Sequence, residues 1–383
     1  MNIPALDPAW RIERIEWARL TGERPREAGC NARLGVHGKQ TRTDLVRITA
    51  GGVTGFGWAA LGMERAREIA GTPVCKMFGP DGLIAQPYRA IEFPLLDWLG
   101  RIAQRSVYAL VAGAGGTEQR ALEVPCYDTS LYIDDLQCTD DEAAAALLQS
   151  EAREGWEKGH RAFKIKIGRG ARHMPLQEGM RRDVAVVRAV RAAVGADARL
   201  MLDANNGLNL NLTKVLLEET AEQAITWMEE PFHEDPVLYE DLKGWLAQKG
   251  LSVLIADGEG EAAAGLVGWA KRGLVDVLQY DVRRPGFTFW LQLARELAGS
   301  PVKAAPHSYG GPYGNYASCH LAPAVENFLF VEWDEVAVPG LDAPGYSIVE
   351  GKVSVPPTPG FGLELDERYY AQQVESEGWR VDA

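Results

Sequence analysis

The fold is decided by a stretch that reads AFKIKI (residues 162–167), VAVVRAVRAAVG (184–195) and LMLD (200–203). The first and third pieces are short apolar runs of strand type. In the middle piece, valines recur at the three- and four-residue spacing of one helix face, and the pattern stops at Gly195. Strand, helix and strand in this order predict a βαβ unit with two parallel strands.

The same alternation continues along most of the chain, where seven intervals of mostly helical pattern separate eight strand-like runs. The runs cover residues 124–128, 162–167, 200–203, 225–229, 251–256, 275–280, 302–306 and 328–332. Eight parallel strands in about 210 residues fit a (β/α)8-type barrel. An open doubly wound sheet is the alternative, but no GxGxxG motif follows the first run to support a dinucleotide site.

The regions on either side of these runs have a different pattern. Strand-like runs at 43–48 and 53–58 predict a β-hairpin, and residues 91–112 predict mostly helix. Beyond Trp333, proline and glycine become frequent, so the chain is expected to leave the barrel there. We therefore expect an N-terminal α+β domain at 1–122, a barrel at 123–335, and a C-terminal segment at 336–383 that returns to the N-terminal domain.

The composition is that of a folded, acidic protein. Of 383 residues, 46% are hydrophobic, and 40 Lys and Arg face 53 Asp and Glu, which gives a net charge of −13. Duplex DNA and anionic membranes are therefore poor partners, and we expect no nucleic acid and no membrane as a partner. A small anionic ligand is compatible with this charge, because a metal ion or nearby lysines can reverse the field inside one pocket.

Cysteine usage and the apolar pattern favour a cytoplasmic enzyme. The five cysteines never occur in a CxxC spacing, which argues against structural zinc and against a disulfide framework. No apolar run approaches the roughly 18 to 20 residues that span a bilayer. Charges also interrupt residues 1–17, where a signal peptide would need an apolar core.

Nearly every expected strand ends in an ionisable residue or is closely followed by one. In chain order these residues are Lys164 and Lys166, Asp203, Glu229, Glu259, Asp281, His307 and Glu332. From Lys166 onward they are 22 to 37 residues apart, about one βα unit each. Barrel enzymes place their chemistry at the carboxyl ends of the strands, so we expect these side chains to converge.

Lys164 and Lys166 lie on one face of the run 162–167, since side chains alternate along a strand. A parallel barrel strand has no solvated face, because helices cover one side and the core fills the other. Two inward lysines need carboxylates nearby, and their mutual repulsion is expected to lower both pKa values. A lysine perturbed in this way can serve as a general base near neutral pH.

Acidic residues follow three successive expected strands. Asp203 and Glu229 each come directly after an apolar run, and the next run is followed by both Asp257 and Glu259. Three oxygen ligands from three adjacent strand ends suit Mg²⁺, which prefers octahedral oxygen coordination and keeps positions open for substrate. The spacing leaves open whether Asp257 or Glu259 is the third ligand.

Asp281 and His307 follow two adjacent expected strands. A carboxylate in that position can bond one imidazole nitrogen, fix the tautomer and raise the pKa of the histidine. His307 would then be an acid or base on the side opposite the lysines. His37 lies in a loop flanked by glycines, which is a candidate cover for the pocket.

As an ordered set, these motifs resemble the enolase superfamily, and its mandelate racemase-like subgroup in particular. The set is Lys164-Ile165-Lys166, Asp203-Ala204-Asn205, Glu229-Glu230-Pro231, Gly258-Glu259, Asp281, His307 and Val331-Glu332-Trp333. The resemblance implies a modified (β/α)7β TIM-type barrel with an α+β capping domain. It implies one Mg²⁺ held by Asp203, Glu229 and Glu259. Glu259 is preferred to Asp257, because a Gly-Glu pair is closer to the subgroup.

The resemblance also implies removal of the proton alpha to a substrate carboxylate. Lys166 would be the base on one face, with Lys164 tuning it. His307, held by Asp281, would be the acid or base on the other face.

Further residues are implied to bind the substrate. Glu332 resembles the subgroup's eighth-strand acid, which hydrogen-bonds the substrate carboxylate and would have to be protonated to donate. Asn205, beside the first acid, and His37, in the Gly-flanked loop, are additional candidates for substrate binding.

Acid and base groups on both faces of the substrate allow three reactions that share one intermediate. Loss of a beta hydroxyl, assisted by His307, gives dehydration of a sugar acid to a 2-keto-3-deoxy acid. We favour dehydration because it uses every residue named above and because the loop at 307–316 is polar and aromatic. Racemisation or epimerisation and cycloisomerisation are the alternatives, and a non-catalytic barrel scaffold is disfavoured because the charged set is complete. We expect a small-molecule carboxylate as substrate and a homo-oligomer as the assembly.

Overall fold

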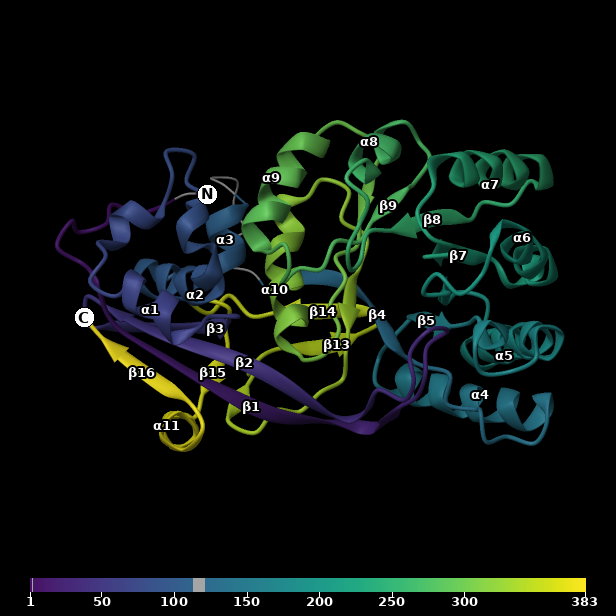
Figure 1. Ribbon diagram of the computed structural model, residues 1–383, viewed down its shortest axis with the longest axis horizontal. Helices are drawn as coiled ribbons and strands as arrows, with labels where there is room; N and C mark the ends of the chain where they lie inside the picture. The colour runs from purple at the N-terminus through teal and green to yellow at the C-terminus, as the bar shows by residue number, and fades with distance from the viewer. Residues whose placement is uncertain (2, 113–120) are drawn as a thin grey trace.

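The computed structural model describes residues 1, 3–112 and 121–383, and the protein is mixed α/β (Figure 1). An antiparallel sheet, formed by strands from the two ends of the chain, lies beside a larger part built from parallel strands and helices. In Figure 1 the long strands β1 (Ile12–Ala28) and β2 (Gly38–Ala50) run from the first part towards β5 in the second. Residues 113–120, in the expected N-terminal domain, lie outside the described residues.

The N-terminal sheet is antiparallel and has the strand order β16-β1-β2-β3. Its two other strands are β3 (Val53–Trp58) and β16 (Trp379–Asp382). The hairpin expected at 43–58 is confirmed, since β2 pairs with β3 in antiparallel register. The pairing of β16 with β1 brings the C-terminal end of the chain to this sheet.

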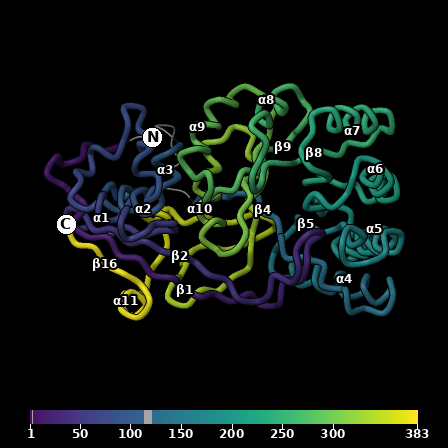
Figure 2. Tube along the Cα trace, viewed as in Figure 1, coloured from purple at the N-terminus to yellow at the C-terminus, as the bar shows by residue number. Residues whose placement is uncertain are grey.

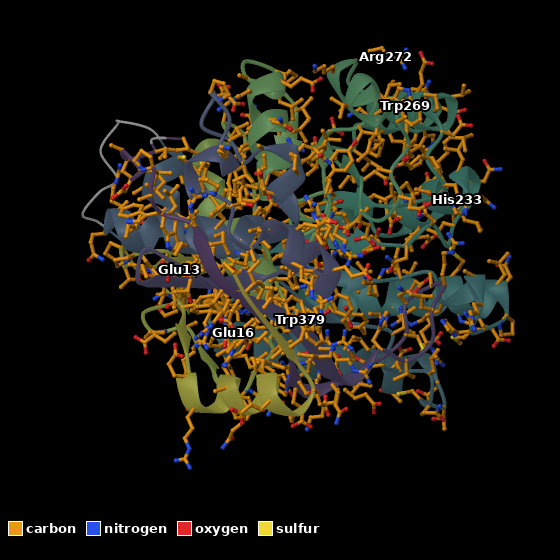
Figure 3. All side chains as sticks on the ribbon, turned by 60° about the vertical axis from the view of Figure 1, so that its left-hand side comes forward. Glu13, Glu16, His233, Trp269, Arg272 and Trp379 are labelled. Carbon is orange, nitrogen blue, oxygen red and sulfur yellow. The ribbon has the colours of Figure 1, made fainter. Side chains whose placement is uncertain are left out.

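A buried charge cluster ties three of these strands together, in the region where Figure 3 labels Glu16 and Trp379. Glu16 on β1 is 1% exposed, and it accepts hydrogen bonds from Arg47 Nε on β2 at 2.8 Å and from Arg380 Nε on β16 at 2.9 Å. On the same strands the rings of Trp17 and Trp379 stack, with centroids 6.2 Å apart. Charge pairing and ring stacking thus fix the last strand against β1.

The helix expected at 91–112 is present but divided in two. Its parts are α2 (Glu92–Ala103) and α3 (Val107–Val111), and α1 (Met63–Ile69) precedes them. Gln104 takes a left-handed conformation with φ 51 and ends α2. The Ser106 side chain then accepts a hydrogen bond from Ala109 N and starts α3.

The parallel strands follow one another in the sheet in chain order. They are β4 (Leu122–Leu131), β5 (Ala162–Lys166), β6 (Arg199–Asp203), β7 (Ile225–Glu229), β8 (Leu254–Asp257), β9 (Val277–Leu278), β10 (Lys303–Ala304) and β11 (Val331–Trp333). The sheet order is β10-β9-β8-β7-β6-β5-β4, and β11 pairs with β4. All eight strands expected from the sequence are therefore confirmed, although β9 and β10 are only two residues long.

One helix follows each of the first seven parallel strands. These helices are α4 (Asp141–Glu157), α5 (Leu176–Val194), α6 (Leu210–Glu219), α7 (Pro236–Lys249), α8 (Leu266–Lys271), α9 (Phe287–Leu297) and α10 (Tyr313–Leu321). Figure 2 shows α4 to α7 lined up along one side of the strands. The predicted helix stop is confirmed, since α5 ends at Val194 and Gly195 follows with φ 78. In the described part of the chain, no helix combines the length and apolar character needed to cross a membrane.

The C-terminal segment contacts both parts of the molecule. Its hairpin of β13 (Ser347–Val349) and β14 (Lys352–Val355) pairs antiparallel with residues 122–125 of β4. Those residues precede the point where β4 meets its parallel partners, so β14 satisfies their backbone groups. Strands of the C-terminal segment therefore pair with β4 as well as with β1. The remaining elements are β12 (Leu341–Asp342), β15 (Glu364–Leu365) and α11 (Glu367–Ser376).

Candidate active site

The carboxyl ends of β5, β6 and β7 lie in register, with Lys166 beside Asp203 and Asp203 beside Glu229. Lys164 Nζ lies 2.7 Å from Glu229 Oε1 and 2.8 Å from Glu332 Oε1. Lys166 Nζ donates a hydrogen bond to Asp203 Oδ2. All five residues of β5 are buried, so the lysines and carboxylates form one charged cluster inside the protein.

The carboxylates reverse the effect that was expected on the lysines. Burial lowers the pKa of Lys164, but attraction to Glu229 and Glu332 is stronger and raises it overall. Burial likewise lowers the pKa of Lys166, and attraction to Asp203 outweighs both burial and repulsion by Lys164. The expected lowering of both lysine pKa values is therefore wrong for this arrangement, because carboxylate attraction exceeds the mutual repulsion.

Glu259, and not Asp257, joins the other two strand-end acids. Strand β8 ends at Asp257, and Gly258 with φ 125 turns the chain, so the two carboxylates diverge. Asp257 accepts hydrogen bonds from Tyr239 OH at 2.5 Å and from Gly258 N at 2.8 Å, and burial raises its pKa. Asp257 is thus held by its own partners and is not one of the converging acids.

Three carboxylates converge closely enough to share one metal ion. Asp203, Glu229 and Glu259 each offer one oxygen, and these oxygens lie within 4.8 Å of one another. Glu229 is oriented by Trp227 Nε1 at 2.9 Å and Gln279 Nε2 at 2.8 Å, which both donate to its Oε2. A donor set of carboxylate oxygens fits a hard cation such as Mg²⁺.

His307 and Asp281 form a hydrogen-bonded pair beside Glu259 and Glu332. His307 Nδ1 lies 2.8 Å from Asp281 Oδ2, while Nε2 lies 3.2 Å from Glu259 Oε2. Burial lowers the pKa of His307, but Glu259, Glu332 and Asp281 outweigh it and raise the pKa to about 9. The raised pKa favours the imidazolium form of His307, whose Nε2 also lies 3.9 Å from Glu332 Oε2.

Glu332 differs from its expected state. It accepts hydrogen bonds from Thr129 Oγ1 at 2.6 Å and from Ser308 N at 2.8 Å, and it pairs with Lys164. Burial raises its pKa, but Lys164 and His307 outweigh this and lower the pKa to about 2. The expectation of a protonated Glu332 is wrong here, because the surrounding groups stabilise its charge.

Asn205 lies beside the acidic cluster. Its Nδ2 donates to Glu259 Oε1 at 3.2 Å and to Glu230 Oε2 at 3.0 Å, and its backbone N donates to Asp203 Oδ1 at 2.9 Å. Its backbone has φ 42, in the left-handed region. The turn after β6 thus directs the amide towards the acids that follow β7 and β8.

His37 lies in the loop between β1 and β2, against two tyrosines. Its ring centroid is 5.3 Å from that of Tyr132 and 5.4 Å from that of Tyr309. The Tyr132 ring in turn has Lys166 Nζ 5.9 Å from its centroid. Burial, and then the charges of Lys166 and Arg24, lower the pKa of His37 to about 4, so it is neutral at pH 7.

Several residues of the site were not singled out from the sequence. Tyr127 on β4 lies under Lys164, with Nζ 5.3 Å from its ring centroid, and Thr129 bonds Glu332. These two positions have the two-residue spacing of one strand face, which is a usable signal. Gln279 bonds Glu229, and it carries no signal beyond its place at the end of an expected strand.

The family comparison matches the part of the chain that carries these residues. A family model described as enolase C-terminal domain-like matches residues 147–369. Among curated proteins, the D-galactarolactone cycloisomerase of Agrobacterium fabrum is 29% identical over 303 residues, which cover 75% of this chain and 74% of that protein.

Two crystal structures are similar over nearly the whole chain. One is a galacturonate dehydratase from Geobacillus sp. complexed with D-galacturonate and 5-keto-4-deoxy-D-galacturonate. It is 49% identical, with a TM-score of 0.94, and the match covers 98% of this chain and 100% of that one. The other is a mandelate racemase/muconate lactonizing protein from Geobacillus sp. Y412MC10 complexed with magnesium/tartrate, which is 49% identical with a TM-score of 0.98 and full coverage of both chains.

Proposed function

The chain belongs to the enolase C-terminal domain-like family, and we propose that it is a Mg²⁺-dependent sugar-acid dehydratase. The observation that carries the proposal is the convergence of Lys166 and His307 on one carboxylate triad. Such an arrangement places a base and an acid around the site where a cation would hold a substrate carboxylate. Similarity over the whole chain to a galacturonate dehydratase supports the same reaction.

We propose a uronic acid of the D-galacturonate type as the substrate class. In the reaction, the C–H bond alpha to the carboxylate and the C–O bond of the neighbouring hydroxyl break. Water leaves, and the resulting enol becomes an α-keto-β-deoxy acid. Counted from the carboxylate, this is the connectivity of the 2-keto-3-deoxy product expected from the sequence. It is also the connectivity of the 5-keto-4-deoxy-D-galacturonate bound to the relative.

Asp203, Glu229 and Glu259 are proposed to hold the Mg²⁺. When bound, the cation would stabilise negative charge on the substrate carboxylate and offset the acidic charge that raises the pKa of the two lysines. The residues present fit this role, since the triad supplies oxygens from three successive strand ends. Trp227 and Gln279 hold Glu229 in place.

Lys166 is proposed to accept the alpha proton at Nζ. Its side chain lies beside Asp203 and faces the ring of Tyr132, which places it at the edge of the triad. Lys164, two residues earlier on the same face of β5, is proposed to lower the pKa of Lys166 by electrostatic repulsion. Lys164 is itself fixed by Glu229 and Glu332, so it is placed to tune and not to react.

His307 is proposed to protonate the leaving hydroxyl. Asp281 fixes the imidazole through Nδ1, which leaves Nε2–H as the donor. The raised pKa keeps the ring charged at neutral pH, as a general acid requires. Asn205 is proposed to contact the substrate carboxylate, and His37 its hydroxyl groups, from their places around the same cluster. Glu332, which is ionised, is proposed to hold Lys164 and the backbone of Ser308 in place.

We propose that the parallel strands close into a modified (β/α)7β barrel, with a capping domain at 1–122 and a return segment at 336–383. In support, Ala304 of β10 is bridged to the segment before β11, with Ala304 N donating to Asn327 O at 3.0 Å and Leu329 N donating to Ala304 O at 2.8 Å. Strand β11 then pairs with β4, the first strand. Closure would bring all the proposed catalytic residues to one mouth.

Cycloisomerisation or epimerisation is the second candidate, and similarity to a D-galactarolactone cycloisomerase favours keeping it. Both reactions share proton removal at the alpha carbon with dehydration. They differ from dehydration in that neither releases water.

The product assay tests the proposed function. The protein is incubated with Mg²⁺ and a panel of acids that contains D-galacturonate, D-glucuronate, D-xylonate and mandelate, and ketoacid is trapped with semicarbazide. We expect ketoacid from a uronic acid, with none from mandelate, which has no beta hydroxyl to lose. A chelator should stop the reaction, and added Mg²⁺ should restore it. Racemised mandelate or a rearranged lactone without any ketoacid would contradict dehydration.

The assignment of the third ligand gives a separate prediction. Glu259→Gln should weaken Mg²⁺ binding by more than about 100-fold, because loss of a direct ligand exceeds the roughly 10- to 100-fold effect of an outer partner. Asp257→Asn is the matched control, since Asp257 lies outside the triad and an amide oxygen can still accept from Tyr239. Calorimetric titration with Mg²⁺ measures both. The reverse order of effects would make Asp257 the ligand.

A further inference from the structure

A glutamate from the N-terminal part of the chain caps a helix in the parallel part. Glu92 is the first residue of α2 and is 4% exposed. Its Oε1 accepts from Phe287 N at 2.9 Å, and its Oε2 accepts from Thr288 N at 2.8 Å. These are the first two residues of α9, whose own N-cap, Gly286, has no side chain to offer. Glu92 therefore supplies from elsewhere the acceptor that the start of α9 needs.

The approach of Glu92 to α9 depends on glycine at position 286. Gly286 has φ 113, a conformation that L side chains rarely adopt. A Cβ atom there would lie 2.0 Å from Glu92 Oε1. The chain before α9 is thus shaped to admit the carboxylate, and the two residues form one unit.

The segment that Glu92 holds is the continuation of the turn that holds Asp281. Asp281 Oδ1 accepts from Arg283 N at 2.7 Å and from Arg284 N at 3.1 Å, and Asp281 is bridged to Pro285. On its other side, Val282 N donates to His307 O at 3.0 Å. The turn at 281–286 therefore joins the His307 pair at one end to the Glu92 contact at the other.

We propose that Glu92 is a positioning residue for the Asp281–His307 pair. By capping α9 it fixes the far end of the turn at 281–286, and this turn sets the direction of the Asp281 carboxylate. The N-terminal part of the chain would thereby contribute to acid catalysis without touching the substrate. The catalytic part of this inference rests on the proposed function, whereas the effect on His307 geometry does not.

A first test compares the two half-reactions in Glu92→Gln. Glutamine keeps one acceptor oxygen but turns an NH2 group towards one of the two backbone N–H groups, so one bond is lost. Displacement of a catalytic group costs about 10- to 100-fold, and we expect kcat for dehydration to fall by this factor with KM nearly unchanged. Exchange of the alpha proton in D2O depends on Lys166 and should continue. The ratio of exchange to dehydration should therefore rise.

Two further variants separate positioning from general destabilisation. Gly286→Ala pushes the carboxylate away without removing it and should raise the same ratio. Glu64→Gln, an exposed acid in the first turn of α1, is the matched control and should leave the ratio unchanged. A parallel fall of exchange and dehydration in both Glu92→Gln and Gly286→Ala would assign Glu92 a purely structural role and overturn the proposal.

A second measurement does not require turnover. In protein with 15N-labelled histidine, the Nδ1–H resonance of His307 is identified by its loss in His307→Asn. We expect this signal to shift or broaden in Glu92→Gln and in Gly286→Ala, and to be unchanged in Glu64→Gln. An unaltered His307 signal in a folded Glu92 variant would overturn the positioning role. Absence of dehydration in the wild type would instead count against the proposed function alone.

Discussion

Replacement of Lys166 by alanine should abolish both dehydration and exchange of the alpha proton. Loss of a general base costs about 10²- to 10⁴-fold, and both processes begin with the same proton. Lys166 bonds Asp203, so its removal takes a positive charge away from a proposed Mg²⁺ ligand. Mg²⁺ binding should therefore be kept or become tighter. Rates in D2O, followed by proton NMR, and calorimetric Mg²⁺ titration measure these effects.

A surface lysine provides the control for this variant. Lys271 on α8 forms an exposed pair with Glu296, away from the cluster, and Lys271→Ala should leave both rates unchanged. If Lys166→Ala retained turnover while still binding Mg²⁺, the base would have been assigned wrongly. Loss of Mg²⁺ binding in Lys166→Ala would instead show that the lysine supports the metal site.

The second large effect is expected for His307→Asn, which should separate the two processes. The asparagine amide cannot act as a general acid at neutral pH, so the rate of dehydration should fall by about 10²- to 10⁴-fold. Exchange of the alpha proton should persist, because Lys166 and the carboxylate triad are unchanged. The NMR signal of the alpha proton should therefore decay in D2O while no ketoacid accumulates.

His320→Asn is an unsuitable control, because His320 is buried and bonds both Tyr108 N and Tyr346 OH. His233→Asn is better matched, since that side chain lies at the surface and contacts Arg33. It should leave dehydration intact. Loss of exchange together with dehydration in His307→Asn would make His307 the base, and an unchanged rate of dehydration would remove it from the reaction.

The parallel architecture was predictable because each βα unit is local in the sequence. Apolar runs of strand length alternate with helix-spaced valines and leucines, and stops such as Gly195 mark the boundaries. The convergence of acids at strand ends follows from parallel register alone. The pairs of Lys166 with Asp203 and of Asp203 with Glu229 are direct neighbours across the sheet.

Charge states were less predictable, since they depend on distances that alternation does not give. Alternation along the strand places Lys164 and Lys166 on one face. It does not show how close the carboxylates lie, and these carboxylates raise both lysine pKa values instead of letting them fall. The pKa of Glu332 is lowered because Lys164 pairs with its carboxylate and the Ser308 backbone N–H donates to it. Such effects arise from residues far apart in the chain.

Local backbone geometry and long-range contacts are the other features that the sequence pattern does not predict. The chain turns at Gly258, between Asp257 and Glu259, whereas strand alternation would place both carboxylates on one face. The contact of Glu92 with Thr288 spans 196 residues and has no periodic signal. The two-residue strands β9 and β10 were found through the runs around them, which extend beyond the paired residues.

Proton NMR of D-galacturonate in D2O, with the wild-type protein and Mg²⁺, shows whether the protein removes the alpha proton. We expect the alpha-proton signal to disappear in step with the appearance of ketoacid, and the neighbouring carbon to gain one deuterium. Neither change should occur in the presence of a chelator. A Mg²⁺-loaded protein that leaves the alpha proton in place in D-galacturonate and in every other sugar acid tried would contradict removal of that proton as its reaction.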